Sequence, residues 1–226
     1  MRCLAIFVLC LVPALATAGA WPREQGKVFL SLSHTLKGDP ATMLTYGIVE
    51  ESYTAVYLEY GLTAKTTVGL DAGYADGGDY TVLVFARRPV GPGTGRNIFA
   101  LKAGAGTARM GNRAQSVLMA GAHWGRGLNT LFGDGWLSLE TGLHYFTARG
   151  ETAAKADLTL GVKPGGKNKV MLQVQAGQYP GSDAYLRLVP SVATQLRKGL
   201  HVEMGAEAGL VGDDRIGLKL GTWLEF

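Results

Sequence analysis

Charged side chains recur at every second or fourth position in several stretches of this chain. Near its end, Glu203 and Glu207 are four residues apart, and so are Arg215 and Lys219. Residues at i, i+2 and i+4 share one face of a β-strand, so such side chains can form ion pairs with each other or line a path for polar solutes. The candidates for this charged face are Lys102, Glu140, His144, Lys155, Asp157, Lys169, Arg187, Glu203, Glu207, Arg215 and Lys219.

A catalytic or metal site is not expected on these stretches. A lipid hydrolase built on β-strands needs a serine and a histidine on its outer surface, with a third residue that orients the imidazole. His34 would face outward, but the adjacent Ser33 points to the other face. The four histidines also lack the i, i+2 spacing that would place two ligands of one metal on one strand. We expect no enzyme activity, no metal and no cofactor, and keep a lipid-modifying hydrolase as a third choice.

The final twelve residues define the element that must position such a charged face. Every second residue from Ile216 to Phe226 is apolar or Thr222, and the residues between them include two glycines and both signs of charge. This period of two predicts a β-strand with one apolar and one polar face. The polar face cannot lie in an apolar core, so we expect the apolar face to meet lipid and the polar face to meet a lumen.

The same pattern recurs along the chain in twelve segments of about the length that a tilted strand needs to cross a bilayer. They span residues 27–35, 53–61, 66–74, 80–88, 96–106, 115–125, 136–147, 153–163, 169–178, 185–195, 200–209 and 215–226. Their opposite faces carry almost no charge, as expected where a lipid-facing Lys or Arg costs about 2–4 kcal/mol at the midplane. We predict an all-β, transmembrane, antiparallel up-and-down barrel of twelve strands, with ten strands as the second choice.

The amino terminus predicts export. Arg2 precedes an apolar run that is too short to span a membrane as a helix, and small residues follow it up to Ala20. We predict a signal peptide at residues 1–20 and a single barrel domain at residues 21–226. Both cysteines, Cys3 and Cys10, lie in the signal segment, so the domain has no thiol chemistry. Without Arg2, 21 basic residues face 18 acidic ones, which gives no argument for nucleic-acid binding.

Three further patterns bear on the lumen. The first external connection, residues 36–52, is the longest, and the sequence leaves open whether it folds inward. The four tryptophans fall toward periplasmic strand ends as an aromatic belt would, although parity points Trp136 and Trp223 inward. Rows of glycine on the inner face favour an open, glycine-lined passage. These rows are Gly69 and Gly73, Gly104 and Gly106, and Gly205 and Gly209.

The last hairpin allows two registers. A turn centred on Val211 would place Glu207 opposite Arg215 and Glu203 opposite Lys219, giving two cross-strand pairs. A register shifted by two residues would make the same residues diagonal neighbours. Such pairs would neutralise each other inside a narrow barrel or contribute to a solute path, and the sequence leaves both readings open.

The alternation that ends in Phe226 resembles the closing strand of Gram-negative outer-membrane β-barrels, whose assembly signal ends in phenylalanine. That resemblance implies the outer membrane as location, reached through the periplasm, with outer-membrane lipid and the barrel-assembly machinery as partners. Chain length and short loops are similar to those of small monomeric twelve-stranded channels for acidic sugars, although no family motif is matched.

In those channels a track of basic lumen residues handles anions. Its counterparts here are Lys102, Lys155, Lys163, Lys169, Arg187, Arg215 and Lys219. Acidic neighbours such as Glu140, Asp157 and Glu203 depart from an all-basic track. We therefore expect passive passage of small polar solutes through a charged lumen, without a prediction of anion selectivity. The competing prediction is a plugged structural or surface-interaction barrel in which the lumen charges pair and no solute crosses.

Overall fold

The computed structural model describes residues 19–111 and 113–226 as twelve strands and one short helix. The signal-peptide prediction for residues 1–18 lies outside the described residues. The strands are β1 (Val28–Gly38), β2 (Glu51–Gly61), β3 (Thr67–Ala75), β4 (Tyr80–Pro89), β5 (Asn97–Met110), β6 (Arg113–Thr130), β7 (Gly133–Phe146), β8 (Glu151–Val162), β9 (Asn168–Gln178), β10 (Tyr185–Arg197), β11 (Leu200–Val211) and β12 (Ile216–Glu225). Each of the twelve predicted segments overlaps one of them, which confirms the strand count.

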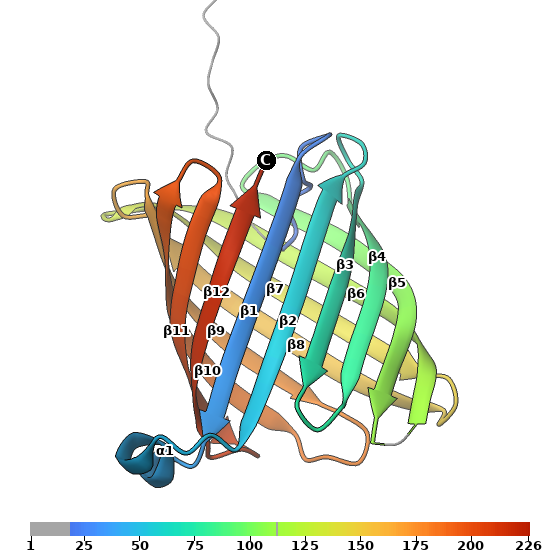
Figure 1. The fold of residues 1–226 in the computed structure, drawn as a ribbon. Helices are drawn as coiled ribbons and strands as arrows, with labels where there is room; N and C mark the ends of the chain where they lie inside the picture. The colour runs from blue at the N-terminus through green and yellow to red at the C-terminus, as the bar shows by residue number, and fades with distance from the viewer. Residues whose placement is uncertain (1–18, 112) are drawn as a thin grey trace, which may run out of the picture.

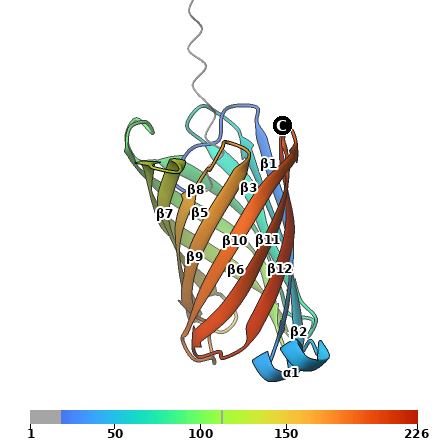
Figure 2. The ribbon, with the colours of Figure 1, turned by 90° about the vertical axis from the view of Figure 1, so that its left-hand side faces the viewer.

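Every strand pairs antiparallel with its neighbours in sequence, and β1 pairs with β12 to close the barrel. At this seam Leu30 lies opposite Leu224 and Leu36 opposite Leu218. The strands tilt strongly across the wall, and the barrel is broader in Figure 1 than in the perpendicular view of Figure 2. The predicted all-β, antiparallel, up-and-down barrel is confirmed, and closure leaves no unpaired sheet edge.

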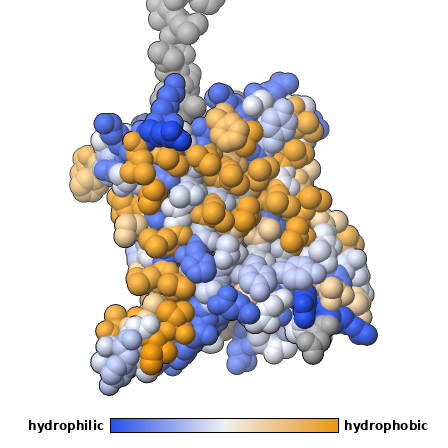
Figure 3. Space-filling view, viewed as in Figure 1, coloured by the Kyte–Doolittle hydropathy of each residue, from blue (hydrophilic) through white to orange (hydrophobic). Residues whose placement is uncertain are grey.

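The outer surface carries the apolar face of the alternating strands. Exposed side chains on it include Val84, Leu101, Leu118, Leu143 and Leu220. Figure 3 shows apolar residues gathered over much of the barrel wall, with polar residues toward its rims. Such a band is what a barrel surrounded by hydrocarbon requires. Within residues 19–111 and 113–226, no helix is long and apolar enough to cross a membrane.

The first external connection contains the helix α1 (Pro40–Tyr46). The Asp39 side chain accepts a hydrogen bond from the Thr42 amide at the start of the helix, and Pro40 occupies its first turn. Gly47, with a φ of 69°, ends it in the left-handed conformation that glycine adopts freely. The helix lies outside the barrel wall, beyond the ends of β1 and β2 (Figure 1). The connection that could have folded inward therefore does not constrict the lumen.

The two ends of the barrel differ. Backbone hydrogen bonds join Gly26 to Gly61 and Val28 to Phe226, so both ends of the described chain meet at one rim, which we call the terminus end. The rim beside α1 is the helix end (Figure 1).

Candidate functional site: the barrel lumen

Part of the stretch that precedes β1 lies inside the barrel. Residues 19–23, which we call the inner segment, enter the lumen at the terminus end. Ala20 is fully buried against Ile98 and Ala100 of β5. The Trp21 ring covers the wall at Gly125 so closely that a Cβ there would clash with it. The inner segment therefore fills part of the lumen that the strands alone would leave open.

A buried ion cluster holds this segment in place. Glu59 accepts from the Arg23 Nη2 at 2.8 Å and from the Arg87 Nη1 at 2.6 Å. The Tyr57 hydroxyl donates to the same carboxylate at 2.8 Å, and Arg87 Nη2 donates to the Trp21 carbonyl at 3.0 Å. Glu59 is 0% exposed and Arg87 2% exposed. The two guanidinium groups and the hydroxyl offset the free-energy cost of removing the Glu59 carboxylate from water. The cluster therefore attaches the inner segment to the barrel wall.

Aromatic side chains also cover the lumen wall at the terminus end. Trp136 packs with Met171 and Ala193, and Trp21 and Trp223 pack against this cluster. Trp21, Trp136 and Trp223 thus face the lumen, so only Trp124 can belong to the outer aromatic belt that the sequence suggested. Parity had pointed Trp136 and Trp223 inward, and that part of the prediction is confirmed.

Several inner-face glycines lie against aromatic rings or close backbone atoms. A Cβ at Gly73 would meet the Tyr53 ring, and one at Gly69 would meet the Phe85 ring. Gly161 is covered in the same way by Trp136. Gly106 and Gly209 face close backbone carbonyls of neighbouring residues instead. The glycine rows predicted to keep a passage open therefore give aromatic rings and backbone room to lie flat on the wall.

A cavity of about 370 Å³ occupies the middle of the lumen. Polar side chains reach it from β1, β2 and β3 and from each of β5 to β12, and Arg23 of the inner segment reaches it as well. Seven of the eleven predicted site residues line it: Lys102, Glu140, His144, Lys155, Asp157, Glu203 and Lys219. The other four face the lumen closer to its two ends.

Inside the cavity, charges are only partly paired. Lys102 Nζ lies 3.8 Å from Asp71 Oδ2 and 3.9 Å above the Phe85 ring centroid. His123 Nδ1 lies 3.4 Å from Glu140 Oε2. Among the described residues, neither Lys155 nor Asp157 has an opposite charge within 4.0 Å. These two side chains thus line the cavity without a close ion-pair partner in the described part of the chain.

The last hairpin adopts the shifted register. Glu207 lies opposite Gly217 and Glu203 opposite Gly221. Lys219 therefore reaches Glu203 diagonally, with Nζ 3.0 Å from Oε1, while Trp223 Nε1 donates to Oε2 at 3.1 Å. The directly opposed pairing of Glu207 with Arg215 and Glu203 with Lys219 is wrong. At the terminus end, Lys169 pairs with Glu225 at 3.2 Å.

Glu207 and Arg215 instead belong to a network at the helix end. Lys37 Nζ and Arg187 Nε lie 2.6 and 3.3 Å from the Glu207 carboxylate. Arg187 and Arg215 both bind Asp213, at 3.1 and 2.8 Å. Arg215 Nη1 also bonds Glu51 at 2.6 Å. Three cations and three anions thus link β1, β2, β10, β11 and the turn between β11 and β12 into a neutral network at this mouth.

The Asp213 carboxyl lies in the turn before β12, outside the strands. Hydrogen bonds from the Arg215 side chain hold its pKa at about 2, below the ordinary value of 3.8. Its carboxylate therefore stays charged well into the acid range, and the network at the helix end stays intact with it.

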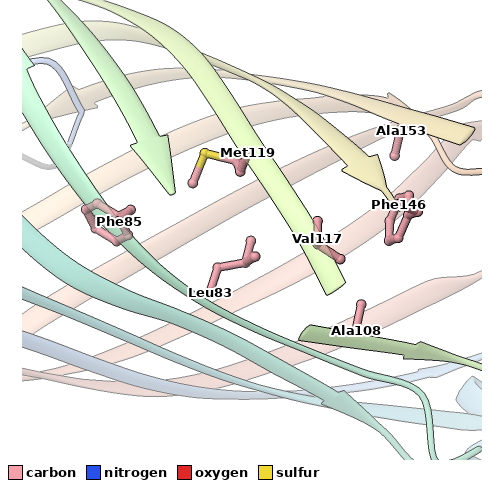
Figure 4. Packing of buried hydrophobic residues seen from close by; sticks show 7 residues of the cluster. All are labelled: Leu83, Phe85, Ala108, Val117, Met119, Phe146 and Ala153. Atoms are coloured by element: carbon pink, nitrogen blue, oxygen red, sulfur yellow. The ribbon is translucent and has the colours of Figure 1, made fainter. Parts of the chain in front are cut away.

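One wall of the lumen is apolar, as Figure 4 shows. Leu83 and Phe85 of β4 pack with Val117 and Met119 of β6, and Phe146 of β7 joins them. Tyr57 stacks on Phe85 with ring centroids 5.6 Å apart. This apolar cluster borders the charged cavity, since Lys102, which lines the cavity, has its Nζ 3.9 Å from the Phe85 ring centroid.

The lumen positions of three charged residues, Arg23, Lys37 and Arg87, were not predicted from the sequence. Arg23 precedes the first strand, so parity could not place it. Lys37 lies beyond the predicted end of that strand. Arg87 and Arg88 sit in a strand whose two faces are both apolar, with Val84 outside and Phe85 inside, so the pattern could not say which arginine turns inward.

The candidate histidine and serine of a hydrolase site face opposite sides of the barrel wall. His34 Nδ1 bonds Thr54 Oγ1 at 2.9 Å on the exposed face, and Ser33 is on the lumen side, as parity predicts. Among the residues that the structure describes, no group of three or more His, Cys, Asp or Glu side chains is placed to hold a metal ion.

No protein-family model matches the chain, and no curated protein matches it. Several solved structures do match the chain. The KdgM porin superimposes with a TM-score of 0.63 at 6% identity, covering 88% of this chain and 99% of that one. The NanC porin gives 0.56 at 9% identity, covering 86% and 98%. An outer membrane channel from Pseudomonas putida F1 gives 0.55 at 10% identity, covering 92% and 98%. The chain therefore has the closed twelve-stranded barrel fold that these porins and channels share.

Proposed function

We propose that this chain is an outer-membrane channel through which small polar solutes diffuse passively. The observation that carries the proposal is a charged central cavity inside a barrel whose outer surface is apolar. An apolar belt suits a hydrocarbon environment, and a polar interior suits water and solutes. The porins and the channel with the same fold support this reading by analogy.

The charges that line the cavity favour solutes of no particular sign. Its cations are Arg23, Lys102, Lys155 and Lys219, and its anions are Asp71, Glu140, Asp157 and Glu203. One KdgM structure holds disordered oligogalacturonate. In this chain the cavity acids oppose a polyanion of that kind, so we propose neutral or zwitterionic polar solutes rather than acidic ones.

The plugged structural barrel remains the second candidate, because the inner segment and its aromatic neighbours narrow the terminus end. The attachment of that segment offers the test. Arg23→Ala removes the contact with Glu59, as well as the guanidinium 5.0 Å above the Phe29 ring, and leaves Arg87 paired. Glu24→Ala, an exposed change next to it, is the matched control.

Single-channel recording in planar bilayers separates the two candidates. For a channel limited by the inner segment, the unmodified protein conducts, Arg23→Ala raises its conductance or open time, and Glu24→Ala changes neither. If unmodified protein and both variants stay silent although the barrels are folded, the plugged structural barrel is the correct candidate.

The proposal also covers export and orientation. We propose that residues 1–20 are removed, so that residues 21–226 form the mature barrel and only residues 21–23 of the inner segment remain in it. We also propose that the strand ending in Phe226 is recognised by the assembly machinery. The terminus end then faces the periplasm and the helix end faces outward, in contact with outer-membrane lipid along the wall. Amino-terminal sequencing of protein extracted from outer membranes tests the cleavage site. A mature chain that starts beyond Arg23 would lack the inner segment and contradict this account of the lumen.

A further inference from the structure

The loop that contains α1 has an amino-acid composition that is unusual for a loop surrounded by water. Residues 40–49, which we call the uncharged segment, carry no Asp, Glu, Lys or Arg. Leu44 is 78% exposed and Tyr46 76% exposed, while Ile48 and Val49 are 50% and 41% exposed. None of the seven residues of α1 is buried. Four large apolar or aromatic side chains are thus gathered at the tip of one external connection without a partner in the described chain.

The position of the segment points to what covers it. It lies beyond the ends of β1 and β2 and to one side of the mouth rather than over it (Figure 1), next to the seam of β1 and β12. Outward-facing Leu218 and Leu220 of β12 are exposed in the same region. Figure 3 shows apolar side chains running from the barrel wall down to the helix. The segment is therefore continuous with the surface that a barrel of this kind presents to lipid.

Contacts of the residues on either side hold the uncharged segment in this position. Asp39 caps the helix, with Oδ1 accepting from the Thr42 amide at 2.9 Å. On the other side Glu51 is tied to Arg215 at 2.6 Å, and the Glu50 amide donates to the Lys37 carbonyl at 2.8 Å. A Cβ at Gly38 would come within 2.7 Å of the Ile48 carbonyl oxygen and 3.4 Å of the Met43 side chain, so the segment lies close against the end of β1. The segment is thus presented as a formed element rather than as a free loop.

We infer that the uncharged segment is an interfacial anchor that rests on the outer leaflet, with Leu44 and Ile48 in its apolar layer and the Tyr46 hydroxyl toward water. This inference rests on the proposed membrane location. A tyrosine beside aliphatic side chains is the composition found where hydrocarbon meets water. A second copy of the chain is a poorer occupant, because four side chains fall well short of the roughly 800 Å² per partner of a stable interface.

Site-directed spin labelling tests the inference. Cys3 and Cys10 are replaced by serine, and a nitroxide is attached in turn at Leu44→Cys, Ser182→Cys and Val84→Cys in protein reconstituted into lipid vesicles. Ser182 is exposed in the turn after β9 and serves as the aqueous control. Val84, 61% exposed on the barrel wall, serves as the lipid control. Collisions with oxygen report lipid exposure, and collisions with a water-soluble nickel chelate report water exposure.

The inference predicts that the label at position 44 resembles the one at position 84, with high oxygen and low nickel accessibility, and differs from the one at position 182. A label at 44 that matches 182 while 84 stays in lipid overturns the anchor and leaves the channel proposal standing. Dipolar broadening between labels at 44 would assign the surface to a second copy instead, which also overturns it. If the label at 84 is itself in water, the membrane location fails.

Discussion

Glu59 and Arg87 form an ion pair of 2.6 Å inside the barrel, and neither side chain has more than 2% of its surface exposed. The two residues stand on β2 and β4, with β3 between them. Arg23 joins the same carboxylate, and Arg87 also binds the Trp21 carbonyl. One buried pair therefore joins the wall of the barrel to the segment that narrows its lumen.

Removing one partner of this pair is expected to be costly. Glu59→Ala leaves the Arg87 guanidinium buried without a carboxylate, which should lower the free energy of unfolding by about 3–5 kcal/mol. Denaturant unfolding of the protein in lipid vesicles measures this loss. Glu24→Ala, on an exposed residue of the same chain region, should leave the midpoint unchanged. If Glu59→Ala and Glu24→Ala lowered the free energy of unfolding equally, the Glu59–Arg87 pair would have no particular role in stability.

The outer belt can be tested by placing a charge on it. Val84→Arg puts a guanidinium on an outward position near the middle of β4, where it should destabilise the barrel by about 2–4 kcal/mol in a bilayer. Asn97→Arg places the same side chain outward at the first residue of β5, near the rim, where the cost should be about 0–1 kcal/mol. Unfolding from vesicles compares the two variants. A cost that does not depend on depth would argue against a membrane around this surface.

The pH dependence of the helix-end network follows from Asp213. Its pKa is about 2 in the folded chain and 3.8 ordinarily, because Arg215 donates hydrogen bonds to the carboxylate. A depressed folded pKa gives stability that is complete above about pH 4 and is lost as the pH falls through about 2.

Asp213→Asn should therefore lower the unfolding midpoint relative to the unmodified protein at pH 7 and pH 5 by the same amount. The difference should shrink between pH 4 and pH 2. A difference that shrinks instead between pH 7 and pH 5 would show that another group controls this mouth.

Cavity charge should set ion selectivity. With four cations and four anions on its lining, the unmodified channel should reverse close to zero potential under a salt gradient. Lys155 has no opposite charge within 4.0 Å among the described residues, so Lys155→Gln should shift the reversal potential toward cation preference. Lys198→Gln, in an exposed turn, is the matched control. An identical shift in both variants would remove Lys155 from the solute path.

The sequence predicted the barrel well because strand alternation is a local property. Lys102, Lys155 and Glu203 were assigned to the lumen from parity alone, and the structure places them there. The face on which a residue lies can be assigned within one strand, without knowing which strands pair. The same charge-free outer face then recurs in strand after strand, and this recurrence supports each assignment.

The arrangement inside the lumen could not be predicted in the same way. Register depends on the geometry of each turn, which decided whether Glu207 met Arg215 or Gly217. The inner segment has no periodicity, so nothing in the order of its residues announces that Trp21 enters the barrel. The inner glycines could equally leave gaps or seat rings, and which occurs depends on aromatic residues of adjacent strands, such as Tyr53 over Gly73.

The most direct test of the channel proposal is block of single-channel current by a thiol reagent in the cavity. Ala55 lines the cavity, and its neighbour Val56 faces outward. In a background with serine at positions 3 and 10, a membrane-impermeant cationic thiol reagent should reduce the current through Ala55→Cys and leave Val56→Cys unaffected. Currents that are absent, or that persist unchanged after complete modification of the cysteine at position 55, would contradict passage of solutes through this lumen.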